Sequence, residues 1–138
     1  MAVTVEKVTI WRKDVAHKPG ELARALEPLS RAGADLRVIM AYAEGDRGIV
    51  EIGPLSGKKL TDAATKSGFV ASTKPTLLIE GDDRPGLGLE IAKAIADQGI
   101  SISFDVTQVI GKKYSAVYGF QSPEAAASAT KAIKKVAR

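Results

Sequence analysis

The stretch that decides the fold is Asp82-Asp83-Arg84-Pro85-Gly86-Leu87-Gly88, a polar turn between an apolar run and a helical pattern. The run 76–79 is typical of a strand, and the spacing of apolar residues over 87–98 predicts a helix. Proline is favoured in the first turn of a helix because its missing N–H would have had no partner there, and an aspartate just before it can cap free amides. The turn is therefore expected to present backbone N–H donors at a helix N-terminus.

The same arrangement occurs 66 residues earlier, as His17-Lys18-Pro19-Gly20-Glu21-Leu22 after the run 8–11. At that spacing, residues that mark turns coincide in the two halves: Pro19/Pro85, Gly20/Gly86, Gly33/Gly99, Gly45/Gly111, Gly53/Gly119 and Ser56/Ser122. Chance would give one or two such matches, and each of these falls at an expected element boundary. The pattern predicts an internal repeat.

The first half predicts the order βαββαβ, preceded by a short extended segment at 2–5. Strands are expected at 8–13, 34–43, 49–52 and 69–72. One helix should follow Gly20 and end at Gly33, and a shorter one should end at Gly68. Proline removes a backbone donor inside a helix, so Pro28 is expected to kink or shorten the first of these helices.

The second half predicts strands at 76–80, 100–109 and 114–120, and helices at 87–98 and from Ser122 to Val136. No sequence remains for a fourth strand. The second sheet should therefore keep an exposed edge unless 2–5 or another chain covers it. We expect two units, 1–73 and 74–138.

Both halves resemble the ACT domain, a small regulatory module with ferredoxin-like βαββαβ topology. The second half carries the resemblance in Asp83-Arg84-Pro85-Gly86 and Gly99-Ile100-Ser101-Ile102, and the first half in His17-Lys18-Pro19-Gly20 and Gly33-Ala34-Asp35-Leu36. The resemblance covers nearly the whole chain. It implies an α+β fold with two helices on one face of each antiparallel sheet, and a regulatory function.

Composition narrows the remaining classes. The chain has 138 residues and a net charge of +4. It contains no cysteine, so disulfides and thiolate chemistry are excluded. A half of about 66 residues buries little apolar area by itself, so we expect the two halves to pack against each other. For the same reason we expect the chain to form a homodimer. No signal peptide or membrane span is visible, and the cytoplasm is the expected location. The basic residues near the C-terminus indicate a solvated helix face rather than a nucleic-acid site.

A free amino acid carries a carboxylate beside an ammonium group, so its receptor needs clustered N–H donors near an acceptor. In the second turn, the amides of Gly86, Leu87 and Gly88 and the carboxylate of Asp83 are candidates, with Arg84 beside them. Asp83 as a plain helix cap is the alternative interpretation, and both roles can coexist. The first turn offers the corresponding residues His17, Gly20, Glu21 and Leu22.

The resemblance adds one position in each half. In ACT proteins that bind amino acids, the ligand lies between paired modules and contacts the residue two places after the glycine that closes the helix. That residue is Ser101 in the second half and Asp35 in the first, where the family usually has asparagine. Because His17 replaces Asp83 in the first turn, the two sites should differ, and the sequence favours the second. A separate regulated protein is implied as partner.

Two other functions compete with amino-acid binding. The chain could be an assembly module without ligand. It could also be an RNA-binding module, since that fold shares the βαββαβ order and Tyr114, Tyr118 and Phe120 lie on one strand face. The first copy has Gly48, Val50, Ile52 and Pro54 on this face, which predicts that the face is buried. No catalytic or metal-ligand pattern is present, and glycine-rich stretches do not match nucleotide motifs, so neither an enzyme nor a cofactor is expected.

Overall fold

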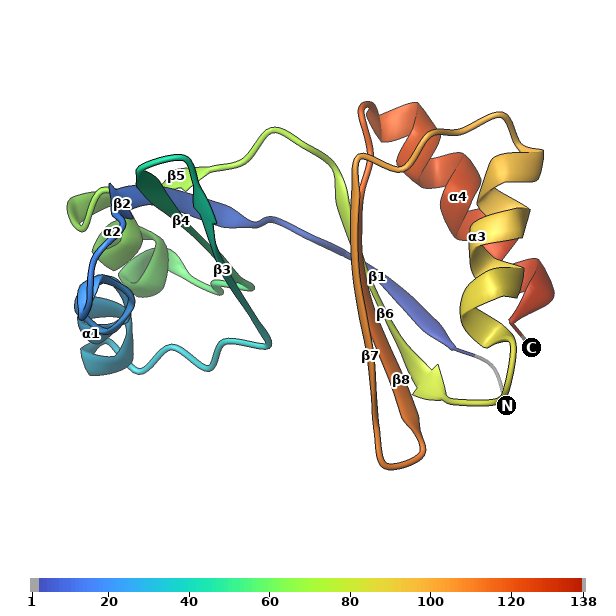
Figure 1. The fold of residues 1–138 in the computed structure, drawn as a ribbon, viewed down its shortest axis with the longest axis horizontal. Coiled ribbons are helices and arrows are strands. Elements are labelled where there is room, and N and C mark those ends of the chain that lie inside the picture. Colours follow the sequence, from blue (N-terminus) through green and yellow to red (C-terminus); the bar gives the residue numbers. More distant parts are fainter. Residues whose placement is uncertain (1–2, 138) are drawn as a thin grey trace. The chain divides into compact units, whose positions relative to one another are not determined.

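The computed structural model describes residues 3–137, and the chain divides into two compact units (Figure 1). The first unit is Thr9–Thr73. The second unit combines the N-terminal residues up to Val8 with those from Lys74 onward. The expected division into 1–73 and 74–138 differs from this one in the N-terminal residues, which precede the first unit in the chain but join the sheet of the second.

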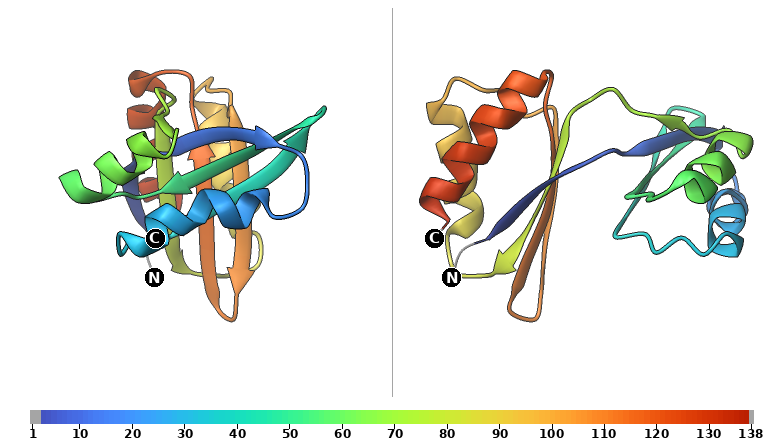
Figure 2. Two further views of the ribbon diagram at one scale, coloured as in Figure 1. Left: turned by 90° about the vertical axis from the view of Figure 1, so that its left-hand side faces the viewer. Right: turned by 180° about the vertical axis from the view of Figure 1, so that it is seen from behind.

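The first unit has the element order β2 (Trp11–Ala16), α1 (Glu21–Arg31), β3 (Val38–Glu44), β4 (Arg47–Gly53), α2 (Lys58–Lys66) and β5 (Val70–Ala71). Its strands form an antiparallel sheet in the order β3-β4-β2-β5, and both helices cover one face (Figure 2). The core between helices and sheet consists of Ala25, Leu29, Val50, Ile52, Ala64 and Phe69. The expected βαββαβ order is confirmed.

The second unit contains β6 (Thr76–Asp82), α3 (Leu87–Asp97), β7 (Phe104–Ile110), β8 (Lys113–Gly119) and α4 (Pro123–Val136). The second half itself supplies no fourth strand, as expected, and the N-terminal segment, one of the two covers that the sequence left open, pairs with its sheet edge. The strand β1 (Thr4–Val8) pairs antiparallel with β6 and gives the order β1-β6-β8-β7. Val3 and Val5 reach the core of this unit, and the N–H of Val3 donates to the carbonyl of Ala137 at 3.1 Å.

The strand registers of the two units match at the spacing seen in the sequence. Val15 is opposite Gly48 in the first unit, and Gly81 is opposite Tyr114 in the second. The other pair of strands agrees, because Ala43 is opposite Gly48 where Val109 is opposite Tyr114. Each partner in the second unit lies 66 positions after its counterpart. The internal repeat therefore extends to individual cross-strand pairs.

Three expectations about element boundaries were wrong. β3 and β7 begin at Val38 and Phe104, four residues later than expected, and β2 begins at Trp11 rather than at residue 8. The N–H of Ala34 still closes helix α1 by donating to the carbonyl of Leu29 at 3.0 Å, so the chain cannot enter the sheet there. Pro28 does not shorten α1, which has 11 residues, as many as α3.

Candidate ligand-binding site

A glycine is the N-cap residue of both α1 and α3, and we call these two helix N-termini, with the turns before them, the first and second entrances. The residue before α1 is Gly20 with φ of 88°, and the residue before α3 is Gly86 with φ of 83°. This left-handed conformation is accessible to glycine at little cost, which explains the repeated Pro-Gly pair. The expectation that Asp83 caps α3 was wrong, because Gly86 occupies the cap position and no side chain accepts a hydrogen bond there.

Part of the expected amide cluster is already used. The N–H of Leu87 donates to the carbonyl of Arg84 at 3.1 Å, so it does not face outward as predicted. In the first turn the N–H of Glu21 lies 3.5 Å from the carbonyl of Lys18, a long and weak contact. The amides that follow in each first helical turn precede any helical carbonyl partner. The N–H of Glu21 is thus more weakly bonded than the N–H of Leu87 at the equivalent position.

Arg84 links the turn before α3 to helices α3 and α4. Its guanidinium lies 2.6 Å from the carboxylate of Glu90 and donates to the carbonyl of Val136 at 3.2 Å. The hydrogen bond from Arg84 lowers the pKa of Glu90 below its ordinary value. The neighbouring Asp82 forms a hydrogen-bonded ion pair with Lys113, which lowers the pKa of that carboxyl as well. Asp83 is half-buried, and its N–H donates to the carbonyl of Lys112 at 2.8 Å.

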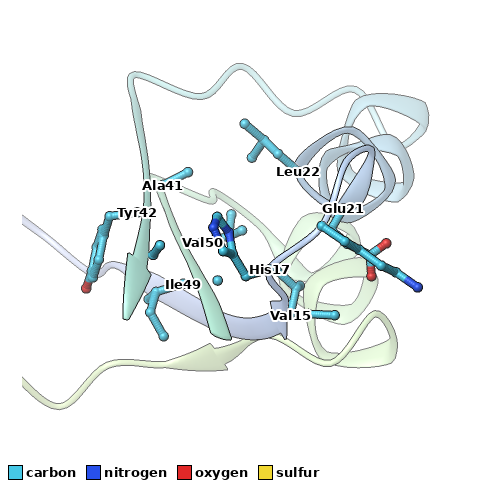
Figure 3. Close-up of a pocket in the computed structure, with 12 residues that line it drawn as sticks. Val15, His17, Glu21, Leu22, Ala41, Tyr42, Ile49 and Val50 are labelled. Atoms are coloured by element: carbon cyan, nitrogen blue, oxygen red, sulfur yellow. The ribbon is translucent and has the colours of Figure 1, made fainter. Parts of the chain in front are cut away.

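A pocket of about 330 Å³ lies at the first entrance, between α1 and the sheet (Figure 3). It is lined by Val15, Ala16, His17, Lys18, Glu21, Leu22, Ala41, Tyr42, Ala43, Gly48, Ile49 and Val50. Figure 3 shows His17 between the strand that carries Ala41 and the helix that carries Leu22. The pocket therefore has aliphatic walls and an imidazole within it.

Two polar lining residues are engaged elsewhere. The carboxylate of Glu21 forms an ion pair with Arg24 on the same helix. The hydroxyl of Tyr42 donates to Glu51, and Figure 3 shows its ring pointing away from His17. Burial and this hydrogen bond raise the pKa of Tyr42 to about 12. The polar side chains that remain to meet a ligand in the pocket are those of His17 and Lys18.

The second unit has a large side chain at the equivalent place. Tyr114 stands where the first unit has Gly48, and its side chain is 2% exposed. Its hydroxyl lies 3.4 Å from that of Tyr118 inside the core. Residues of α3 such as Leu87 belong to the same core cluster. The space beside the second entrance is thus occupied by the protein itself.

The structure brings together only some of the predicted site residues. His17, Glu21 and Leu22 line one pocket, and Gly20 lies between His17 and Glu21 in the chain, at the N-cap of α1. Asp35 is exposed on the segment before β3, outside the set that lines this pocket, and Ser101 is exposed on the corresponding segment before β7. Both were expected at strand starts, but they lie three residues before their strands.

Sequence reasoning missed the sheet residues of the pocket, including Val15, Ala41 and Gly48. One signal was available. The aligned halves place Gly48 against Tyr114, a large difference in side-chain volume at a position that should be buried.

The RNA alternative fails on burial. Tyr114, Tyr118 and Phe120 are 2%, 1% and 0% exposed, and they pack against α3 and α4. Bases can stack only on aromatic rings that face solvent. The prediction that this strand face is buried is confirmed, and these rings cannot form an RNA platform.

Within residues 3–137, no group of three or more His, Asp or Glu side chains is arranged to hold a metal ion. Over the same residues, every helix is too short or too polar to span a bilayer.

Known structures share this architecture. A protein from Bacteroides thetaiotaomicron matches with a TM-score of 0.78 and 15% identity over 92% of this chain and 88% of its own. The regulatory subunit of aspartate kinase from Thermus thermophilus matches with a TM-score of 0.67 and 16% identity over 100% of this chain and 98% of its own. The chain has a tandem ACT fold.

The ACT fold also occurs as part of longer chains. Aspartate kinase from Clostridium acetobutylicum matches over 99% of this chain but 34% of its own, with a TM-score of 0.58 and 12% identity. No protein-family model and no curated protein matches this chain in sequence. At these identities the comparisons establish the architecture of the ACT units and leave their ligand to chemical argument.

Proposed function

We propose that this protein is a non-enzymatic regulatory protein that binds an amino acid or a similar small zwitterionic metabolite. The observation that carries the proposal is the 330 Å³ pocket at the N-terminus of α1, which is lined by His17 and lies beside the weakly bonded N–H of Glu21. This volume lies at the lower end of the range for ligand pockets, about 300–1,000 Å³, and so suits a small metabolite. Regulatory subunits of aspartate kinase among the structural neighbours support a regulatory role.

The pocket offers complementary chemistry for such a ligand. The N-terminus of α1 attracts a carboxylate, because its first amides lack helical partners and the helix dipole is positive there. His17 adds a ring nitrogen that can donate to the same carboxylate. Each peptide carbonyl of the turn has two lone pairs, so it can accept a hydrogen bond from the ammonium group. The sequence favoured the second entrance, but the distribution of space in the two units favours the first.

The test is a thermal-shift screen against the twenty amino acids, followed by calorimetry on each hit. A ligand at 100 times its Kd should stabilise the folded chain by about 2.7 kcal/mol. His17→Ala should weaken binding about tenfold or more. Asp83→Ala is the matched control, because Asp83 holds the same position in the second turn, and it should leave affinity unchanged.

Each opposite outcome is informative. Loss of binding in Asp83→Ala but not in His17→Ala would move the site to the second entrance. A flat screen, with no amino acid raising the melting temperature, would contradict the proposal and favour an assembly module.

One observation favours the assembly alternative. Strand β7 is an edge strand, and it exposes Val106, Val109 and Ile110 at 47%, 48% and 66%. Exposed apolar edges invite pairing with another chain. Because of this exposed edge and the small size of each unit, we propose that the chain forms a homodimer. We also propose that the regulated partner is a separate enzyme. Sedimentation equilibrium tests the dimer, and a monomer at all concentrations would contradict it. The cytoplasmic location stays a prediction.

A further inference from the structure

We propose that the chain binds one ligand, in the first unit only, and that this ligand carries a small aliphatic side chain. The inference rests on the proposed function and specifies both the stoichiometry and the ligand class. It is carried by an exchange of side chains at one cross-strand pair, which leaves space in one unit and fills it in the other.

The side chains differ at one pair of opposite residues, between β2 and β4 in the first unit and between β6 and β8 in the second. In the first unit this pair is Val15 and Gly48, and in the second it is Gly81 and Tyr114. A glycine is present in both pairs, but the partner is valine in one and tyrosine in the other. The first pair thus contributes much less side-chain volume under its helix, and the 330 Å³ pocket is lined by both of its members.

In the second unit the equivalent space is filled by side chains of the hydrophobic core. Tyr114 is 2% exposed and belongs to the cluster that contains Leu87 and Ile91 of α3. A ligand could enter here only if the ring of Tyr114 left the core, which would strongly destabilise a close-packed interior. A second equivalent of ligand at the second entrance is therefore not expected.

The walls of the open pocket select the ligand class. Val15, Leu22, Ala41 and Val50 are aliphatic, and they come from β2, α1, β3 and β4. Two charged residues, Lys18 and Glu21, also line this pocket, and Glu21 is paired with Arg24. A charged ligand side chain placed among these aliphatic walls would lose its hydration, which disfavours it there. A valine-, leucine- or isoleucine-like side chain would instead fill the space and shed water.

The experiment is isothermal titration calorimetry of the intact chain with leucine, isoleucine, valine, aspartate and lysine. We expect about one site per chain and an affinity for the best aliphatic ligand at least tenfold higher than for aspartate or lysine. Among the aliphatic ligands, one methylene should change affinity by roughly tenfold or more, as in other apolar pockets.

Two variants test the location. Gly48→Tyr copies the second unit and should abolish binding. An added Cβ there would lie 3.0 Å from Cγ2 of Val15, so circular dichroism and NMR must show that the variant folds. Ala41→Leu narrows the pocket from the exposed strand β3 and should weaken leucine binding at least tenfold. Its matched control is Thr107→Leu, at the equivalent position of the second unit, which should bind as the wild type does.

Failure of this inference is distinguishable from failure of the proposed function. Two ligands per chain, preference for a charged amino acid, or equal effects of Ala41→Leu and Thr107→Leu would each overturn the inference while amino-acid binding stands. The absence of binding by any amino acid would overturn the proposed function, and this inference with it.

Discussion

At the scale of single residues, Gly119 shows how closely the second unit is packed. A Cβ added at Gly119 would lie 2.0 Å from Cε2 of Phe104, the residue opposite it on β7. We predict that Gly119→Ala lowers the free energy of unfolding by about 1–3 kcal/mol, because the ring would have to move. Urea denaturation measures the change.

Two comparisons isolate this contact. In a Phe104→Ala background, Gly119→Ala should cost much less, and an equal cost in both backgrounds would show that ring crowding is not the cause. Gly88→Ala is the unstrained control, since an added Cβ meets nothing within 4 Å there. Alanine favours helix formation over glycine, so Gly88→Ala should stabilise the chain by up to about 1 kcal/mol.

The ion pair at the second entrance gives a pH prediction. Arg84 lowers the pKa of Glu90, so the pair stabilises the folded chain above the ordinary glutamate pKa, and this contribution is lost as the pH falls through the lowered value. We predict that Arg84→Gln returns the pKa of Glu90 to its ordinary range in an NMR titration. A pKa that stays low in the variant would mean that another group is responsible.

At the scale of elements, α1 continues through Pro28 where α3 has Ala94. Proline inside a helix removes one hydrogen bond and costs about 3 kcal/mol. We predict that Pro28→Ala raises the free energy of unfolding by about 1–3 kcal/mol in denaturant titrations. The reciprocal change, Ala94→Pro, should destabilise the buried face of α3. A lower stability of Pro28→Ala would show that packing of the proline ring outweighs the lost hydrogen bond.

At the scale of the whole molecule, the two ends of the described chain meet in one unit. The N–H of Val3 bonds to the carbonyl of Ala137, and β1 completes the sheet next to β6. We predict that a circular permutant that begins at Thr9 and joins Arg138 to Met1 through a short Gly/Ser linker folds cooperatively. Each unit would then be a continuous βαββαβ segment.

The matched control is a chain that also begins at Thr9 but lacks residues 1–8. It leaves the edge of β6 unpaired and removes Val3 and Val5 from the core, so its melting temperature should be lower than that of the permutant. Equal melting temperatures by circular dichroism would show that β1 contributes little to the second unit.

Local patterns in the sequence determined much of this protein: the duplication, the order of elements in each half, the Pro-Gly helix entrances and the buried face of β8. These features depend on turn residues and on the alternation of apolar side chains, which act over a few positions. Amino-acid binding and the residues of the site remain predictions, although three of those residues line one pocket.

Only the tertiary structure decided two other features. The sequence left open whether the N-terminal segment or another chain covers the second sheet, and the structure pairs residues 4–8 with 76–80. The pocket likewise depends on which side chains are opposite each other across strands, Val15 with Gly48 and Gly81 with Tyr114. Space is a property of packed neighbours, so it emerges only when distant strands are placed side by side.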